Sequence, residues 1–70
     1  PNPVVGHLTI ENLKKGIAAD IAIYNFLGEK VYAAINSDEH VVDCRLLSPG
    51  IYWIELNNGE GIFKGKFIKR

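Results

Sequence analysis

The chain has almost no cysteine, so disulfides cannot hold it together. Its 70 residues include one cysteine, Cys44, and no methionine. The two histidines, His7 and His40, lack the cysteine pair that would complete a zinc site. A chain this short buries only about 60% of the surface that its unfolded state exposes. Its stability must therefore come from packing of its apolar side chains, which make up 47% of the composition.

Long hydrophobic runs are also missing. No apolar stretch approaches the roughly 20 residues that span a membrane as a helix, and the chain shows neither an initiator methionine nor a signal peptide. We expect a single domain, residues 1–70, cut from a longer protein.

The chain has no net charge, but its charges are unevenly distributed. Residues 1–63 hold all eight acidic side chains and four basic ones, whereas the last seven residues hold Lys64, Lys66, Lys69 and Arg70. A basic end either attracts an anionic surface or keeps an edge strand soluble, and we favour the second interpretation. No basic stripe with interleaved aromatics extends along the chain, so we expect no nucleic-acid partner.

Side chains that could carry chemistry lack suitable neighbours. Thr9 and Ser48 have no histidine or acid at a spacing that indicates a catalytic partner. His40 and Cys44 share a face if they lie on a strand, but they would stand about 13 Å apart. The alternating acids of a calcium loop and the glycine-rich loop of a phosphate site are both missing. We therefore expect no enzyme activity, catalytic residue, metal site or cofactor.

Short apolar runs separated by turn residues predict an all-β domain. No window has a sustained helical period with caps, so no helix is expected. The expected strands are His7–Asn12, Asp20–Phe26, Lys30–Ile35, His40–Cys44, Gly50–Leu56 and Gly61–Lys69.

Alternation along these strands assigns the side chains to faces. Val31, Ala33 and Ile35 share one face, as do Phe63 and Phe67. Within each of the other strands, the following residues are expected to share one face: Leu8 and Ile10; Ile21 and Ile23; Val42 and Cys44; and Tyr52, Ile54 and Leu56.

Four polar or glycine-containing segments predict turns between strands, and the first is Lys14-Lys15-Gly16. Gly28 in Leu27-Gly28-Glu29 accepts the positive φ of a tight hairpin. Asn36-Ser37-Asp38 is expected to be a polar turn, and Asn57-Asn58-Gly59 a hairpin loop with a type I′ turn.

The segment Leu47-Ser48-Pro49-Gly50-Ile51-Tyr52 has the pattern of a tyrosine corner. In such a corner, a tyrosine near the start of a strand returns its hydroxyl group to the backbone a few residues upstream. Pro49 fixes φ for the turn, and Gly50 can adopt a conformation that other residues resist. This motif favours a small immunoglobulin-like Greek-key antiparallel β-sandwich of six to seven strands.

Trp53 falls on the face opposite Tyr52, beside Ile51. An exposed aromatic on a sheet can mark a surface for a partner or a sugar. Alternatively, the ring covers a second sheet in so thin a domain. The sequence leaves both interpretations open, so Trp53 is a candidate exposed partner surface.

The order of these pieces resembles a known family. The resemblance rests on Pro1-Asn2-Pro3 at the start, the strand and turn around Gly28, the Leu47–Tyr52 corner, and Lys66-Phe67-Ile68-Lys69 at the end. Together they look like the type A C-terminal sorting domain of proteins that the type IX secretion system of Bacteroidetes exports. The chain departs from the family pattern at Cys44-Arg45, where Leu-Ser is common.

The resemblance implies an immunoglobulin-like fold and a role as a secretion signal. The implied partners are the outer-membrane type IX translocon, its shuttle protein, a cell-surface sortase and a cargo domain in the same chain. The implied location is secreted or at the cell surface, reached through the periplasm and the outer membrane.

Recognition would involve the fold and its terminal segments. The candidate signal residues are Pro1, Asn2, Pro3, Gly28, Leu47, Gly50, Tyr52, Lys66, Phe67, Ile68 and Lys69. The ordinary alternative is that the prolines stiffen a linker and that the last strand only completes the core.

Two other functions remain open. The first is an accessory adhesion or carbohydrate-binding sandwich on a secreted enzyme, which would use several coplanar aromatics, here Trp53 and Tyr32. The second is a protease inhibitor on the same scaffold, although no long loop is expected. Open sheet edges also allow edge-strand self-association.

Overall fold

The computed structural model describes residues 4–10, 18–38 and 41–70. The described residues form six β-strands and no helix, so no helix could cross a membrane there. The strands are β1 (His7–Thr9), β2 (Ala19–Tyr24), β3 (Lys30–Ser37), β4 (Val41–Asp43), β5 (Gly50–Asn57) and β6 (Ile62–Lys69). The predicted strands are confirmed in number and order, with ends that shift by a few residues. The predicted turn at Lys14–Gly16 lies outside the described residues.

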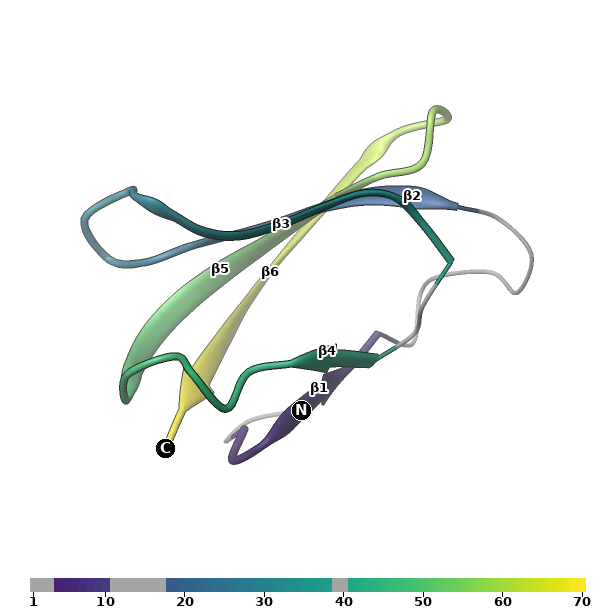
Figure 1. Ribbon diagram of the computed structural model, residues 1–70. Coiled ribbons are helices and arrows are strands. Elements are labelled where there is room, and N and C mark those ends of the chain that lie inside the picture. The colour runs from purple at the N-terminus through teal and green to yellow at the C-terminus, as the bar shows by residue number, and fades with distance from the viewer. Residues whose placement is uncertain (1–3, 11–17, 39–40) are drawn as a thin grey trace.

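The strands form two antiparallel sheets that pack as layers (Figure 1). The larger sheet has the order β3-β2-β5-β6, and the smaller sheet pairs β1 with β4. The connections β1–β2, β3–β4 and β4–β5 therefore cross from one sheet to the other, whereas the β2–β3 and β5–β6 hairpins each stay within the larger sheet. The all-β sandwich class predicted from sequence is confirmed.

The core lies between the two layers. Ile23 and Cys44 are fully buried, and Val42 is nearly so. The other core side chains are Val4, Leu8, Ile10, Ala19, Ile21, Tyr52, Leu56 and Phe67. The faces assigned to β1, β2, β4 and β5 by alternation are therefore confirmed, because alternate residues of a strand point to opposite sides of a sheet.

Gly28 and Asn25 together stabilise the β2–β3 turn. Gly28 has φ 82°, a value that residues with a Cβ adopt only at a cost. The side-chain oxygen of Asn25 accepts hydrogen bonds from the backbone amides of Leu27 and Glu29, each at 3.0 Å. The chain reversal predicted at Gly28 is confirmed.

Two turn predictions need correction. β3 continues through Ser37, and Asn36 stays within the strand with φ 54° at an irregularity in its pairing with β2. The Asp20 carboxylate accepts a hydrogen bond from the Asn36 amide at 2.9 Å, which stabilises this irregularity. Residues 36–38 are therefore not a separate turn.

The β5–β6 loop is longer than a type I′ turn. Asn57 still pairs with Ile62, so four residues, Asn58–Gly61, form the loop. Gly59 has φ 87°, but Asn58 does not have positive φ, whereas a type I′ turn needs positive φ at both central residues. The Asn58 side chain instead accepts hydrogen bonds from the amides of Glu60 and Gly61.

The structure shows how far the assigned faces of β3 and β6 are buried. Val31, Ala33 and Ile35 share the exposed face of β3, while Tyr32 and Ala34 pack against the core. Phe63 and Phe67 are in phase on β6, yet Phe67 is 2% exposed and Phe63 is 48% exposed. Burial on this face therefore changes sharply along β6.

Candidate functional site

The tyrosine corner forms as the sequence predicts. The hydroxyl group of Tyr52 donates a hydrogen bond of 2.6 Å to the backbone carbonyl of Ser48. The ring stacks on Phe67, its partner across β5 and β6, with 5.5 Å between ring centroids. Gly50 begins β5 with φ 157°, and Leu47 packs against the core. Leu47, Gly50 and Tyr52 therefore fix the chain where it passes from the small sheet to the large one.

The start of the described chain is hydrogen bonded to its end. The amide of Val4 donates to the carbonyl of Ile68 at 2.7 Å, and the amide of Arg70 donates to the carbonyl of Val4 at 2.8 Å. Val4 thus pairs with Lys69 in a parallel bridge along the edge of β6 that does not pair with β5. We call these contacts the terminal bridge.

Two residues further on, the same segment reaches the other sheet. The carbonyl of Gly6 accepts a hydrogen bond of 2.8 Å from the amide of Cys44, and His7 then begins β1. Val4 itself is 2% exposed and belongs to the core. The segment Val4–Gly6 therefore ties the last strand to the small sheet, although Val4 and Lys69 stand at opposite ends of the sequence.

The four candidate residues at the end of β6 split between two faces. Phe67 and Lys69 are buried, and the Lys69 ammonium donates to the carbonyl of Arg70 at 2.6 Å. Lys66 and Ile68 are exposed on the outer face of the large sheet. On this face their neighbours across β5 and β6 are Trp53 and Ile51, respectively. Of the four residues, only Lys66 and Ile68 have exposed side chains.

The remaining candidate residues lie in the β2–β3 turn or outside the described part of the chain. Gly28 lies in the β2–β3 turn, at the same end of the sandwich as the tyrosine corner (Figure 1). A groove between this turn and the corner is lined by Phe26, Leu47, Gly50 and Tyr52, among others. Pro1, Asn2 and Pro3 lie outside the described residues.

The comparison with protein families identifies the family of the chain. The family model of the secretion system C-terminal sorting domain matches residues 1–70, the whole chain. The chain belongs to this family. No curated protein matches it.

Membership gives the sorting domain a general function. A domain of this family is a type IX secretion signal, so it acts with the secretion machinery on a protein that is exported to the cell surface or beyond. The predicted resemblance, including its Bacteroidetes setting, is confirmed.

Trp53 lies on the outer face of the sorting domain, where it is 42% exposed. Its neighbour across β2 and β5 is Tyr24, whose ring lies 5.9 Å from the Lys30 ammonium. Tyr32 instead packs against the core, so it cannot form one aromatic surface with Trp53. The register between β2 and β5 places Tyr24 beside Trp53, and this register could not be inferred from sequence.

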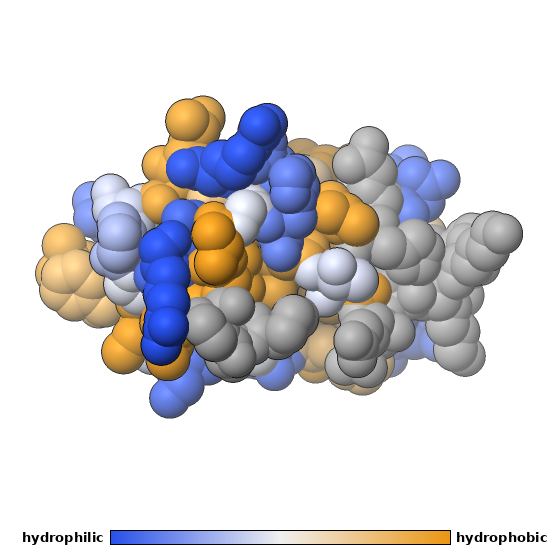
Figure 2. Space-filling model, turned by 90° about the horizontal axis from the view of Figure 1, so that it is seen from below, coloured by the Kyte–Doolittle hydropathy of each residue, from blue (hydrophilic) through white to orange (hydrophobic). Residues whose placement is uncertain are grey.

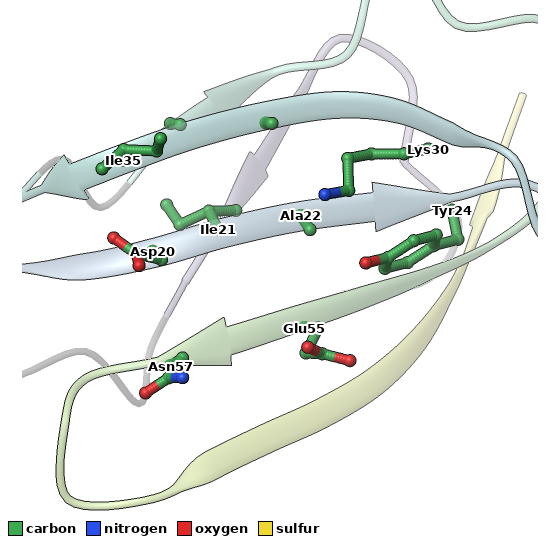
Figure 3. A pocket seen from close by; sticks show the side chains of 10 residues that line it. Asp20, Ile21, Ala22, Tyr24, Lys30, Ile35, Glu55 and Asn57 are labelled. Carbon is green, nitrogen blue, oxygen red and sulfur yellow. The ribbon is translucent and has the colours of Figure 1, made fainter.

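A shallow pocket lies beside Tyr24 on this outer face (Figure 3). Ala22 and Ala33, which pair across β2 and β3, have small side chains that leave space above the sheet. The Tyr24 ring and Lys30 lie at one end and Ile35 at the other; Asp20, Glu55 and Asn57 complete the polar side. The pocket volume is about 300 Å³.

Groups that could hold metal ions or react do not cluster in the described part of the sorting domain. No three His, Cys, Asp or Glu side chains come together there. The Asp43 carboxylate forms an ion pair with Arg45 at 2.7 Å, which holds the pKa of Asp43 well below its usual range. Cys44 is fully buried, and its thiol donates to the carbonyl of Val42 at 3.6 Å. Asp43 and Cys44 each have a bonding partner within the domain.

Proposed function

We propose that this sorting domain directs an attached cargo protein across the outer membrane through the type IX translocon, and that a cell-surface sortase then removes the domain. In this proposal the domain is a substrate of the translocon, the shuttle protein and the sortase, and it catalyses no reaction. Family membership supports the secretion route, and the resemblance described above supports these specific partners.

The terminal bridge is the observation that carries the proposal. It holds Val4, which directly follows the Pro1–Pro3 segment, against the end of the final strand. A signal divided between the two termini of the chain needs both segments in one place. The bridge provides this only when the domain is folded, so the translocon or its shuttle would recognise a folded surface and not an extended tail.

Within that surface the candidate residues have different roles. Lys66 and Ile68 present side chains on the outer face of the large sheet and would contact the partner. Phe67, Lys69 and Tyr52 are buried and would position that strand. Gly28, Leu47 and Gly50 would maintain the loops at the same end, and Pro1–Pro3 would add the N-terminal part of the signal.

A transplant tests whether the domain is a sufficient signal. The chain is fused, with a short native linker, behind a signal peptide and a fluorescent protein in a type IX-competent bacterium. We expect the reporter at the surface or in the medium, and in the periplasm of a translocon-deficient strain. A folded fusion that stays in the periplasm of both strains would refute the proposal.

Truncating the last strand is a poor control in this experiment. Deleting Lys66–Arg70 removes Phe67, which is 2% exposed in the core, together with both hydrogen bonds of the terminal bridge. The deletion therefore destroys the fold and the signal together. A reporter fused to an unrelated small β-sandwich provides a better negative control, because it keeps size and fold class constant.

A carbohydrate-binding or adhesion role is a second candidate, favoured by the Tyr24–Trp53 pair and its adjoining pocket. Aromatic faces with nearby carboxylate and amide groups are the usual components of sugar sites. Titration of the chain with cell-wall glycans, compared with Trp53→Ala, tests it. Saturable binding that Trp53→Ala removes would support this function, and no binding at millimolar glycan would exclude it.

A further inference from the structure

Large apolar side chains project from two loops at one end of the sandwich. Phe26 and Leu27 in the β2–β3 turn are 73% and 68% exposed, and Leu46 in the β4–β5 loop is 100% exposed. Apolar residues accordingly colour the end of the molecule that holds the β2–β3 turn, at the left of Figure 2. We call Phe26, Leu27 and Leu46 the apolar tips.

The tips border a groove that no charged side chain lines. It has a volume of about 470 Å³, and its apolar walls include Phe26, Val31, Leu46, Pro49 and Ile51. Exposed apolar patches of this kind mark sites of contact with proteins or membranes in otherwise soluble domains. The charges around the groove distinguish between these two occupants.

Charges are segregated along the length of the described structure. The end with the apolar tips exposes three basic side chains, Lys30, Arg45 and Arg70, against two acidic ones, Glu29 and Asp43. At the opposite end acids exceed bases: Asp20, Asp38, Glu55 and Glu60 against Lys64. The apolar tips therefore coincide with the positive end of the domain.

This combination fits an anionic lipid surface better than another protein. Stable protein interfaces bury about 800 Å² on each partner over a broad patch, whereas the apolar groups here project from the tips of two loops. Membrane-surface binding adds the burial of a few apolar side chains to attraction between basic residues and anionic head groups. Both contributions are present at this one end.

We propose that the sorting domain docks on phosphate-bearing lipid head groups with this end. Phe26, Leu27 and Leu46 enter the boundary between head groups and acyl chains, and Lys30 and Arg70 face the lipid phosphates. The acidic end points away from the membrane, because the same surface charge repels it. This binding activity goes beyond the sorting function and does not depend on it.

Vesicle sedimentation tests the proposal with the 70-residue chain. Vesicles of equal parts phosphatidylglycerol and phosphatidylcholine are compared with vesicles of phosphatidylcholine alone. We expect binding to the anionic vesicles, weak or no binding to the neutral ones, and release in about 0.5 M salt, where screening is strong.

Two matched variants separate the tips from general surface hydrophobicity. Phe26→Ser/Leu46→Ser should weaken binding to anionic vesicles by about tenfold or more, because two large apolar side chains no longer leave water. Ile35→Ser is the control, since Ile35 is 84% exposed near the opposite end of β3, and it should change binding less than about twofold. Circular dichroism confirms that each variant is folded.

Four results would overturn the proposal. The first is equal binding to neutral and anionic vesicles, and the second is no binding to either. The third is that Ile35→Ser weakens binding as much as the double variant does. If Phe26→Ser/Leu46→Ser blocks export of a reporter while vesicle binding is unchanged, the groove contacts a protein of the secretion machinery and the lipid proposal is wrong.

Discussion

The amide of Val4 donates a hydrogen bond of 2.7 Å to the carbonyl of Ile68, and the amide of Arg70 donates back to Val4. The segment that leads out of Pro1–Pro3 is thereby fixed to the last strand. A cargo protein joined to the N-terminal side would attach beside the C-terminal end of the domain. This arrangement places residues from both ends of the chain side by side on the domain.

The terminal bridge should contribute measurably to stability through Val4. Val4→Ala removes methyl groups from a side chain that is 2% exposed, and we expect it to lower the free energy of unfolding by about 1–2.5 kcal/mol. Val5→Ala is the matched control, because Val5 is 70% exposed, and it should change stability by less than about 0.5 kcal/mol. Urea unfolding measures both, and equal losses would show that Val4 does not anchor the segment.

The tyrosine corner should depend on one hydroxyl group. Tyr52→Phe keeps the ring on Phe67 but removes the hydrogen bond to the Ser48 carbonyl. We expect a loss of about 0.5–1.5 kcal/mol in the free energy of unfolding. Tyr24→Phe on the outer face is the control and should be close to neutral. A Tyr52→Phe variant as stable as the parent would show that stacking alone holds the corner.

The β2–β3 turn should reject a side chain at Gly28. Because Gly28 has φ 82°, Gly28→Ala should destabilise the domain by about 1 kcal/mol. Gly61→Ala is the comparison, since Gly61 does not have positive φ and a Cβ at this position would meet no atom within 4 Å. It should be neutral or slightly stabilising. Thermal unfolding of the two variants separates these effects, and the reverse order would contradict the turn geometry.

Cys44 should be unreactive in the folded domain. Its side chain is fully buried, and burial raises the pKa of its thiol above the usual 9.0. A thiol reagent at about pH 8 should therefore label it only in denaturant, because the thiolate is the reactive form. Rapid labelling of the native chain would contradict this burial.

The same pKa shift has a defined effect on stability. Above pH 9 the unfolded chain loses the Cys44 proton before the folded chain does, so the folded state binds more protons. The stabilising contribution is complete below the unfolded pKa and is lost as pH rises through the folded pKa. Cys44→Ala should accordingly show a shallower decline in stability at alkaline pH than the parent does.

Local patterns were sufficient to predict much of this fold. Alternation placed Ile21 and Ile23 on the core side, and the spacing from Leu47 to Tyr52 predicted the corner that the 2.6 Å hydrogen bond confirms. Gly28 also adopts the positive φ that its turn suggested. In each case the deciding interactions lie within a few residues of one another.

Features that depend on distant contacts could not be predicted in this way. Val4 pairs with Lys69 across almost the whole chain, and Tyr24 meets Trp53 only because of the register between β2 and β5. Phe63 shares a face with Phe67 but remains 48% exposed. Alternation assigns a face; it does not say how far the opposing layer covers it.

We propose that the secretion machinery recognises the outer face at the end of β6, which the terminal bridge holds in place. The most direct test compares two double variants of the fluorescent fusion, both on the outer face of this strand. Lys66→Gln/Ile68→Thr alters the proposed signal. The control, Ile62→Thr/Lys64→Gln, makes the same two types of substitution near the start of β6. The measurement is the fraction of reporter that is exported, with melting temperatures confirming that both domains are folded. We predict that the first variant stays in the periplasm and the second is exported like the parent; equal export of the two would contradict the claim.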